Sequence, residues 1–277
     1  MSASELQACL AHLYTSAAFR RLVALEAERA LDGYFLTAAE RLSITTIDAD
    51  ALERFAESLE VKRRRQLERA YPALFALDPA VLETLCRRYH ELYPRRPDES
   101  VDTDVTQFGT FVEQTLTGGE PFARHAADLA RFERLMYELR QRAAGADQDA
   151  DRRHQPAARR DGEARARRCD GVAVARFHCN VSEIDDALRQ GLTPDVRHEQ
   201  EFIVCGLRDD ERLPRILRVS AAVALVVELC DGERSAADVA AAIEAQFSEQ
   251  GLASSVDDII RQLADAQILE VADGALV

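Results

Sequence analysis

Apolar residues recur every three or four positions through the first half of the chain, and this spacing predicts amphipathic helices across residues 3–143. The longest is expected over residues 49–71, ended by a proline at position 72, and further helices over residues 79–93, 105–116 and 120–142. Residues typical of helix N-termini precede several segments, namely Ser16, Asp48, Asp78 and the capping box of Thr37 and Glu40. Short loops between the segments indicate an antiparallel helical bundle.

The pattern changes after residue 168. Runs of β-branched and aromatic residues predict strands at residues 172–181, 201–206 and 215–219, with a short helix over residues 183–190, and we expect the strands to form one three-stranded sheet. Ser220, Ser235 and Ser255 then stand where three helices begin, and Gly232 is placed to end the first of them in the left-handed conformation. Residues 268–271 predict a last short strand. This order is that of a winged helix-turn-helix.

Residues 144–168 separate the two patterns. They are rich in Ala, Arg, Asp and Gln and lack apolar periodicity, which is typical of a linker or mobile loop. The predicted fold class is therefore mainly α with a small α+β domain. We expect a helical domain at residues 1–143, a linker at 144–168 and a winged-helix domain at 169–277.

Composition narrows the class of protein. The 277 residues are 47% hydrophobic and 30% charged, which suits a globular protein with room for two domains. No apolar run reaches 18 residues, so no membrane span is expected, and the first residues lack the basic and apolar segments of a signal peptide. We therefore expect a cytoplasmic protein whose six cysteines are reduced and mostly buried.

Charge bears on the first function that a winged helix suggests, which is DNA binding. Residues 170–277 contain 21 acidic and 9 basic residues, and the third predicted helix carries Asp257, Asp258 and Asp265 against Arg261 alone. A duplex binder needs cations to neutralise phosphates, so such an acidic domain is expected to be repelled by nucleic acid. A winged-helix transcriptional regulator nevertheless stays open as the alternative function.

The sequence predicts no catalytic residue, metal or cofactor in this chain. None of the six histidines lies three or four positions from another, and phosphate-binding loops, G-x-S-x-G and H-E-x-x-H are missing. His178 and Cys179, with Cys169 and Cys205 nearby in sequence, are the one candidate metal cluster, although buried structural thiols are the interpretation we favour. A free-standing metal enzyme is the second competing function.

A basic run occupies residues 62–65 of the long predicted helix. It could contact an acidic partner or a phosphate. A solvated helix face, balanced by Glu57, Glu60 and Glu68, is the interpretation we favour.

The last quarter of the chain resembles the PqqD-like recognition domain found in the biosynthesis of ribosomally made, modified peptides. The resemblance rests on residues 215–219 (Arg-Ile-Leu-Arg-Val), 229–232 (Leu-Cys-Asp-Gly), 235–243 and 256–269, in that order. It implies that the leader of a precursor peptide adds a strand beside the third strand and against the third helix. The residues expected at this groove are Arg215, Ile216, Leu217, Arg218, Val219, Val256, Ile260 and Arg261, of which Val256 and Ile260 suit a plain core equally well.

The helical half carries a second resemblance, at residues 13–15, 19–22, 36–40, 47–48, 52–63 and 71–74. These segments are similar to the partner subunit of multinuclear non-haem iron oxidases that modify peptides, as in the methanobactin and 3-thiaglutamate pathways. The resemblance implies that a TIM-barrel partner holds the iron, while this chain recognises and delivers the peptide. The 3-thiaglutamate partner, which assists excision of the β-carbon of a C-terminal cysteine on a carrier peptide, is the most similar that we identify.

Overall fold

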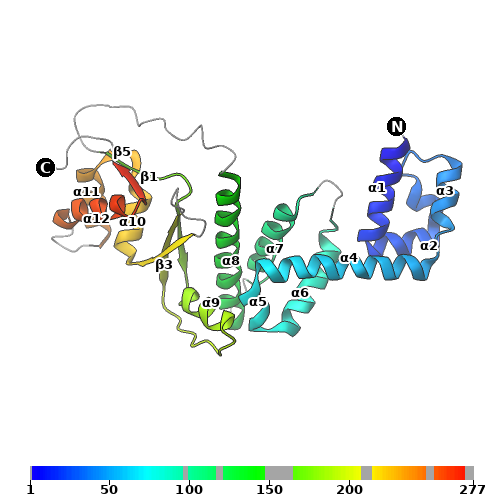
Figure 1. Ribbon diagram of the computed structural model, residues 1–277, viewed down its shortest axis with the longest axis horizontal. Coiled ribbons are helices and arrows are strands. Elements are labelled where there is room, and N and C mark those ends of the chain that lie inside the picture. Colours follow the sequence, from blue (N-terminus) through cyan, green and yellow to red (C-terminus); the bar gives the residue numbers. More distant parts are fainter. Residues whose placement is uncertain are drawn as a thin grey trace. The chain divides into compact units, whose positions relative to one another are not determined.

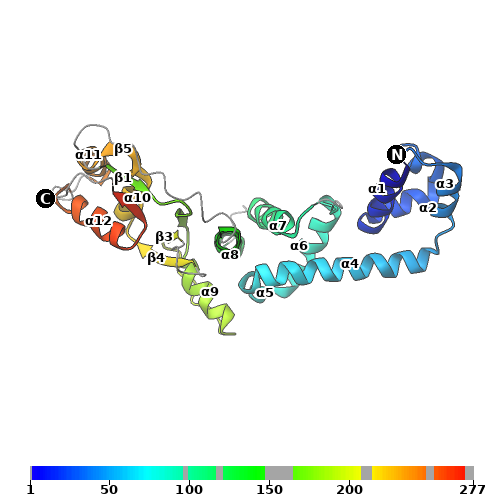
Figure 2. The ribbon, with the colours of Figure 1, turned by 45° about the horizontal axis from the view of Figure 1, so that its top comes forward.

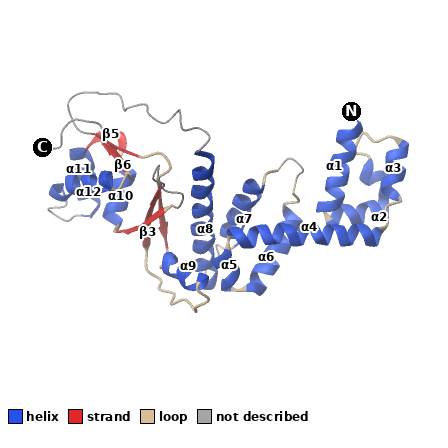
Figure 3. Cartoon of the chain, in the orientation of Figure 1, coloured by secondary structure: helices blue, strands red, loops and turns tan. Residues whose placement is uncertain are grey.

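The computed structural model describes residues 2–95, 99–116, 121–146, 165–206, 214–247 and 253–271 (Figure 1). These residues form mainly α-helices together with two small antiparallel sheets, which confirms the predicted mixture of many helices and little sheet (Figure 3). The chain divides into two compact units. The first, called the helical unit below, comprises Met1–Arg134 and Glu183–Pro194, and the second, called the sheet unit, comprises Leu135–Ser182 and Asp195–Val277.

Capping explains where most helices of the helical unit begin. The side chains of Ser16, Asp48 and Asp78 accept backbone N–H groups at helix N-termini, and Thr37 and Glu40 form the predicted reciprocal capping box. The helices are α1 (Ser2–Thr15), α2 (Ala17–Leu31), α3 (Ala38–Thr45), α4 (Ala49–Ala70), α5 (Pro72–Leu77), α6 (Pro79–Leu92), α7 (Val101–Thr115) and α8 (Pro121–Ala146, in this unit as far as Arg134), with most of α9 (Val181–Arg189).

Three predicted boundaries in this half are corrected. Pro72, expected only to end a helix, also begins α5, because a proline fits the first turn where its missing N–H is not needed. Helix α7 begins at Val101, four residues earlier than expected, because Ser100 accepts the N–H of Thr103. Helix α8 continues to Ala146, into the segment that was expected to be a linker.

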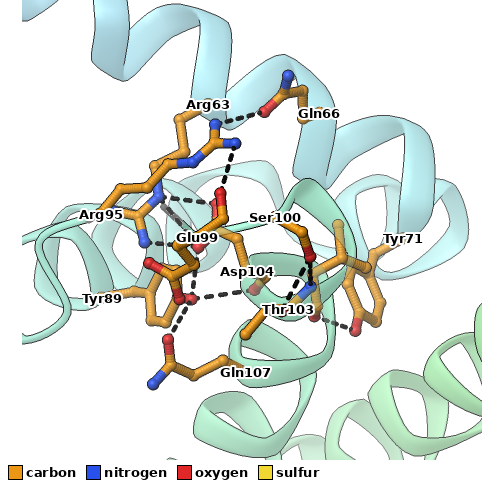
Figure 4. Close-up of polar contacts among 11 residues, drawn as sticks. Arg63, Gln66, Tyr71, Tyr89, Arg95, Glu99, Ser100, Thr103, Asp104 and Gln107 are labelled. Atoms are coloured by element: carbon orange, nitrogen blue, oxygen red, sulfur yellow. Dashed lines mark hydrogen bonds and ion pairs between the residues drawn. The ribbon is translucent and has the colours of Figure 1, made fainter. Parts of the chain in front are cut away.

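A buried ion pair lies at the centre of α4, α6 and α7 (Figure 4). Arg63 of α4 is 7% exposed, and its Nε and Nη2 donate to both carboxylate oxygens of Asp104 at 2.6–3.1 Å. Tyr89 of α6 donates its hydroxyl to the same carboxylate at 2.7 Å, and the Arg63 guanidinium lies 4.7 Å from the centroid of its ring. The expectation that residues 62–65 form a solvated face is therefore wrong for Arg63, since helical spacing turns it inward.

A second buried carboxylate holds α5 against α8. Glu133 is 1% exposed and accepts the N–H groups of Ala73 and Leu74, at the start of α5, at 3.0 and 2.9 Å. Arg189 of α9 donates to the same carboxylate at 2.8 Å. A helix N-terminus has unsatisfied N–H groups and a partial positive charge, so a carboxylate stabilises it.

The predicted three-stranded sheet of the sheet unit is confirmed. Strands β2 (Ala173–Phe177), β3 (Glu201–Gly206) and β4 (Arg215–Val219) form an antiparallel sheet in the order β2-β3-β4. The first strand ends at Phe177 rather than at residue 181, and helix α9 begins at Val181, two residues earlier than expected.

A second sheet was not predicted. Strands β5 (Asp231–Ser235), β1 (Arg165–Arg168) and β6 (Leu269–Val271) pair antiparallel in the order β5-β1-β6. Residues 165–168, assigned to the linker, and residues 231–235, expected as a glycine turn, are too polar to signal strands. Residues 165–168 and 231–235 pair with each other although they are far apart in the sequence, so the local sequence could not predict the pairing. Gly232 does have a positive φ of 85°, but it lies within β5, and Cys230 caps the preceding helix.

Three helices complete the sheet unit: α10 (Ala221–Leu229), α11 (Ala236–Phe247) and α12 (Ala253–Asp265) (Figure 2). Their apolar faces share one core with strand residues, in which Val204, Val226, Ile243 and Ile268 are at most 1% exposed. Ser220 caps α10, and Ser235 and Asp238 exchange hydrogen bonds at the start of α11, as predicted. Helix α12 begins before Ser255, its expected cap.

Among the described helices, none combines the length and apolar character needed to cross a bilayer. All six cysteines lie within the described residues and form no disulfide, and Cys169 is the one that is not fully buried.

The buried Arg63–Asp104 pair predicts a large loss of stability on Asp104→Asn. Removing the carboxylate charge leaves a buried guanidinium without compensation, which costs roughly 3–5 kcal/mol of unfolding free energy. Urea denaturation followed by circular dichroism measures this.

The matched control is Glu68→Gln, which removes the partly exposed Arg64–Glu68 pair on the same helix and is expected to cost less than about 1 kcal/mol. Equal effects of the two substitutions would contradict the assignment of Arg63–Asp104 as the central contact.

Candidate functional site

The sequence predicted that residues 215–219, which form β4, lie at the centre of a binding groove. The residues that flank β4 explain where the strand begins and ends. Pro214 precedes the strand and cannot continue a helix, and Ser220 follows it and caps α10 through the N–H of Val223 at 3.3 Å. All five residues of β4 pair with β3, from Gly206 opposite Arg215 to Phe202 opposite Val219. The strand is thus fixed at both ends and along one side.

The other side of β4 is a sheet edge. The order β2-β3-β4 places β4 last, and no other strand among the described residues pairs with it. In an antiparallel sheet, every second residue of an edge strand directs its N–H and C=O groups away from its neighbour. The outer side of β4 therefore presents backbone donors and acceptors in the spacing that another extended chain would match.

The two faces of β4 differ. Leu217 and Val219 pack against the core of the sheet unit. Because side chains alternate along a strand, Ile216 and Arg218 lie on the opposite face, and both are exposed. Ile216 is 42% exposed. Among the described residues of this unit, no other large hydrophobic side chain is as open to solvent. An exposed isoleucine next to an open strand edge is accessible to an apolar side chain of an added chain.

The structure divides the eight residues predicted to form the groove. Val256 and Ile260 are 1% and 3% exposed and belong to the same core as Leu217 and Val219. They lie behind β4 in the core, which is the alternative that the sequence left open for these two residues. Their role as peptide contacts stays a prediction. Val256 and Ile260 are four residues apart, so both side chains point to the inward face of α12. Apolar periodicity alone could not distinguish a groove wall from a core.

The basic residues of the predicted site are distributed over two elements. Arg215 and Arg218 lie on opposite faces of β4. Arg215 is two positions from Leu217 and shares its face, whereas Arg218 shares the exposed face with Ile216. Arg261 is exposed on α12 and donates to Asp258 at 2.8 Å, an i, i+3 surface pair. Asp257 and Asp265 are exposed on the same helix. The surface of α12 is therefore acidic, and the cations lie mainly on the strand.

Sequence patterns did not identify Phe202 as a neighbour of β4. Phe202 of β3 lies directly opposite Val219, so the two side chains share the face that packs toward the helices. Phe202 is half-buried, and the Arg176 guanidinium of β2 lies 5.8 Å from the centroid of its ring. Only the strand register reveals this neighbour, and the register was not readable from the sequence.

The candidate metal cluster is not assembled. Among the residues that the structure describes, no group of three or more His, Cys, Asp or Glu side chains is placed to hold a metal ion. Cys179 and Cys205 are buried, whereas His178 is exposed. Burial raises the pKa of the Cys205 thiol to about 12, so the thiol stays protonated at neutral pH and is a poor ligand or nucleophile.

Comparison with protein families and with curated proteins finds no match: no protein-family model matches the chain, and no curated protein matches it significantly.

Two isoleucines of the sheet test the exposure of the β4 edge. Ile203→Ala removes a side chain that is fully buried on β3 and is expected to cost about 2–5 kcal/mol. Ile216→Ala removes an exposed one and is expected to cost less than about 1 kcal/mol. Thermal or urea unfolding of the two variants measures the difference. A cost at Ile216 as large as that at Ile203 would mean that another part of the chain covers β4.

Proposed function

We propose that this chain is a non-catalytic subunit that binds the leader of a precursor peptide and presents the peptide to an iron-dependent oxidase. The observation that carries the proposal is the open edge of β4 with Ile216 exposed beside it. Strand addition to such an edge supplies main-chain hydrogen bonds for affinity, and the flanking side chains select the sequence. The arginines of β4 add attraction for an acidic leader within an otherwise acidic unit.

The proposal includes a finer fold assignment. The order β4, α10, α11, α12, β6 follows that of a winged helix-turn-helix of the PqqD-like kind, with β5, β1 and β6 in the position of the wing. The core that joins Leu217 and Val219 to Val256 and Ile260 supports this assignment, because it holds the sheet against the third helix of the series. The acidic exposed face of α12 argues against the alternative of a DNA-binding regulator.

In this proposal the helical unit docks on the oxidase. The expected partner is a TIM-barrel subunit with a multinuclear iron site, and the iron and the oxidative chemistry belong to it. Tethering the leader at β4 raises the effective concentration of the reactive residue at that iron. Excision of the β-carbon of a C-terminal cysteine, as in 3-thiaglutamate biosynthesis, is the reaction that we propose for the pair.

Exposed apolar side chains support a docking role for the helical unit. Phe35, between α2 and α3, is 87% exposed, and Leu42 of α3 is 64% exposed. Exposed apolar side chains that lie together in a patch are typical of surfaces that another protein covers, whereas single ones are common on any surface. The proposal treats Phe35 and Leu42 as part of such a patch. We assign the partner oxidase to this end of the helical unit.

Leader binding is predicted to depend on β4. Replacing Ile216 by Ala and, separately, reversing Arg215, Arg218 and Arg261 together to Glu should each weaken binding of a labelled leader peptide by about tenfold or more, because an anchor or the complementary charge is lost. Fluorescence anisotropy measures the affinity, with a leader taken from a small reading frame beside the gene.

The charge control reverses Arg54, Arg65 and Arg69, three exposed arginines of α4, and is expected to leave the affinity unchanged. Hydrogen exchange gives the second readout, since alternate β4 amides should become protected when the leader is added. Binding that survives the triple reversal at β4, or retardation of DNA without peptide binding, would refute the proposal.

Docking is predicted to depend on Phe35 and Leu42. Co-expression with the neighbouring oxidase should give a stable complex in which the iron stays with the oxidase, and Phe35→Ser with Leu42→Ser should abolish co-purification by removing buried apolar area. Leu92→Ser, which alters a leucine that is 57% exposed at the end of α6, is the control and should leave the complex intact. Stoichiometric iron in this chain purified alone would contradict the assignment of roles.

A further inference from the structure

A pocket of about 350 Å³ lies within the helical unit, where the C-terminal end of α1, the middle of α4 and the end of α6 meet. Part of its lining is apolar and comes from Ala11, Leu59 and the ring of Tyr14. Phe55 holds that ring edge-on, with the ring centroids 4.7 Å apart. The volume is within the range of about 300–1,000 Å³ that is typical of small-ligand sites, and such sites combine apolar walls with a few polar groups.

The polar part of the lining carries a surplus of positive charge. Arg63 is already paired with Asp104, but Lys62 and Arg95 have no such partner: neither pairs with a carboxylate within the described part of the chain. Arg95 donates to two neutral acceptors, the side chain of Gln66 and the backbone carbonyl of Glu99, each at 3.4 Å (Figure 4). These contacts are long, so the guanidinium keeps most of its capacity to bind an anion.

The acidic member of the lining is Glu60, which is exposed on α4. One carboxylate against Lys62 and Arg95 leaves the pocket locally positive in a chain whose net charge is −14. This local reversal of sign favours an anionic ligand over a cationic or neutral one.

His90, which lines the same pocket, has a buried ring nitrogen that lacks a hydrogen-bond partner within the described part of the chain. It is 9% exposed, and its Nε2 has no hydrogen-bond partner among the described residues. Burial and the nearby Arg63 charge lower the pKa of His90 to about 4, so the ring is neutral at neutral pH and one nitrogen carries a proton to donate. A buried nitrogen without a partner is unfavourable, and a ligand oxygen that accepts a hydrogen bond from it would remove that cost.

We propose that this pocket binds a small carboxylate with an apolar body. Lys62 and Arg95 hold the carboxylate, His90 donates to it after a small adjustment of the lining, and the apolar body lies against Leu59 and Tyr14. Two sources share this chemistry: a free carboxylic-acid metabolite and the C-terminal residue of a peptide. The proposal is independent of leader binding at β4, because every lining residue belongs to the helical unit.

Isothermal titration with N-acetyl-L-leucine and with N-acetyl-L-leucinamide tests the proposal on the full chain. The acid should bind, and the amide, which has the same body without the charge, should bind about tenfold more weakly or worse. Lys62→Gln and Arg95→Gln should each weaken binding of the acid by a similar factor. Arg65→Gln removes an exposed arginine three residues from Lys62 and should leave it unchanged.

Two further measurements complete the test. The His90 ring signal in proton–carbon NMR, assigned by His90→Gln, should shift on addition of the acid. Binding of N-acetyl-Ala-Ala-Leu with a free but not an amidated C-terminus would identify a peptide chain end as the source, and binding of N-acetyl-L-leucine without the tripeptide would identify a free metabolite. No binding of either acid at millimolar concentration, equal binding of acid and amide, or equal loss with Arg65→Gln would overturn the proposal.

Discussion

The ion pair between Arg63 and Asp104 is the contact on which the helical unit depends. Two opposite charges are stable in the interior only when their hydrogen bonds are satisfied. Here both oxygens of Asp104 accept from Arg63, one of them also accepts the Tyr89 hydroxyl, and the guanidinium lies over the Tyr89 ring. The pair therefore fixes the positions of α4, α6 and α7 relative to each other within this unit. Close packing follows from the same constraint: a Cβ on Gly109 would meet the Tyr71 hydroxyl, which donates to the Val105 carbonyl.

The same ion pair shapes the pocket beside it. Arg63 contributes to the lining, yet its charge is neutralised by Asp104, so Lys62 and Arg95 determine which ligands the pocket favours. Its proximity also disfavours a charged His90. The Arg63–Asp104 ion pair and the proposed binding pocket thus share Arg63. Neighbouring residues of α4 point in different directions, so Arg63 reaches Asp104, whereas Lys62 at the pocket has no carboxylate partner among the residues described.

In the sheet unit, the corresponding constraint is the central position of β3. Val204 and Leu217 face the helices, whereas Ile203 is fully buried on the other face, so the register between β3 and β4 is strongly specified. Among the described residues, β4 is held firmly by β3 on one side and has no strand on the other, which would make it a rigid template for an added chain. Rigidity lowers the entropy cost of binding, which supports a recognition role for β4.

The sequence alone predicted most of the helices, several of their capping residues, the three strands β2, β3 and β4, and the acidic character of the third helix in the sheet unit, since these depend on local periodicity and composition. It missed α5 and the Ser100 cap of α7, and Ser255, the expected cap of α12, lies inside that helix. It did not reveal β1 and β5, whose polar residues become strands only because partners distant in sequence pair with them. Nor could it separate Val256 and Ile260, which are core, from Ile216, which is exposed, because apolar residues at regular spacing suit either place. The tertiary structure alone decided that Arg63 turns inward to Asp104 and that Lys62, His90 and Arg95, from α4 and the end of α6, meet at one pocket, because long-range packing, which no local pattern encodes, brings them together.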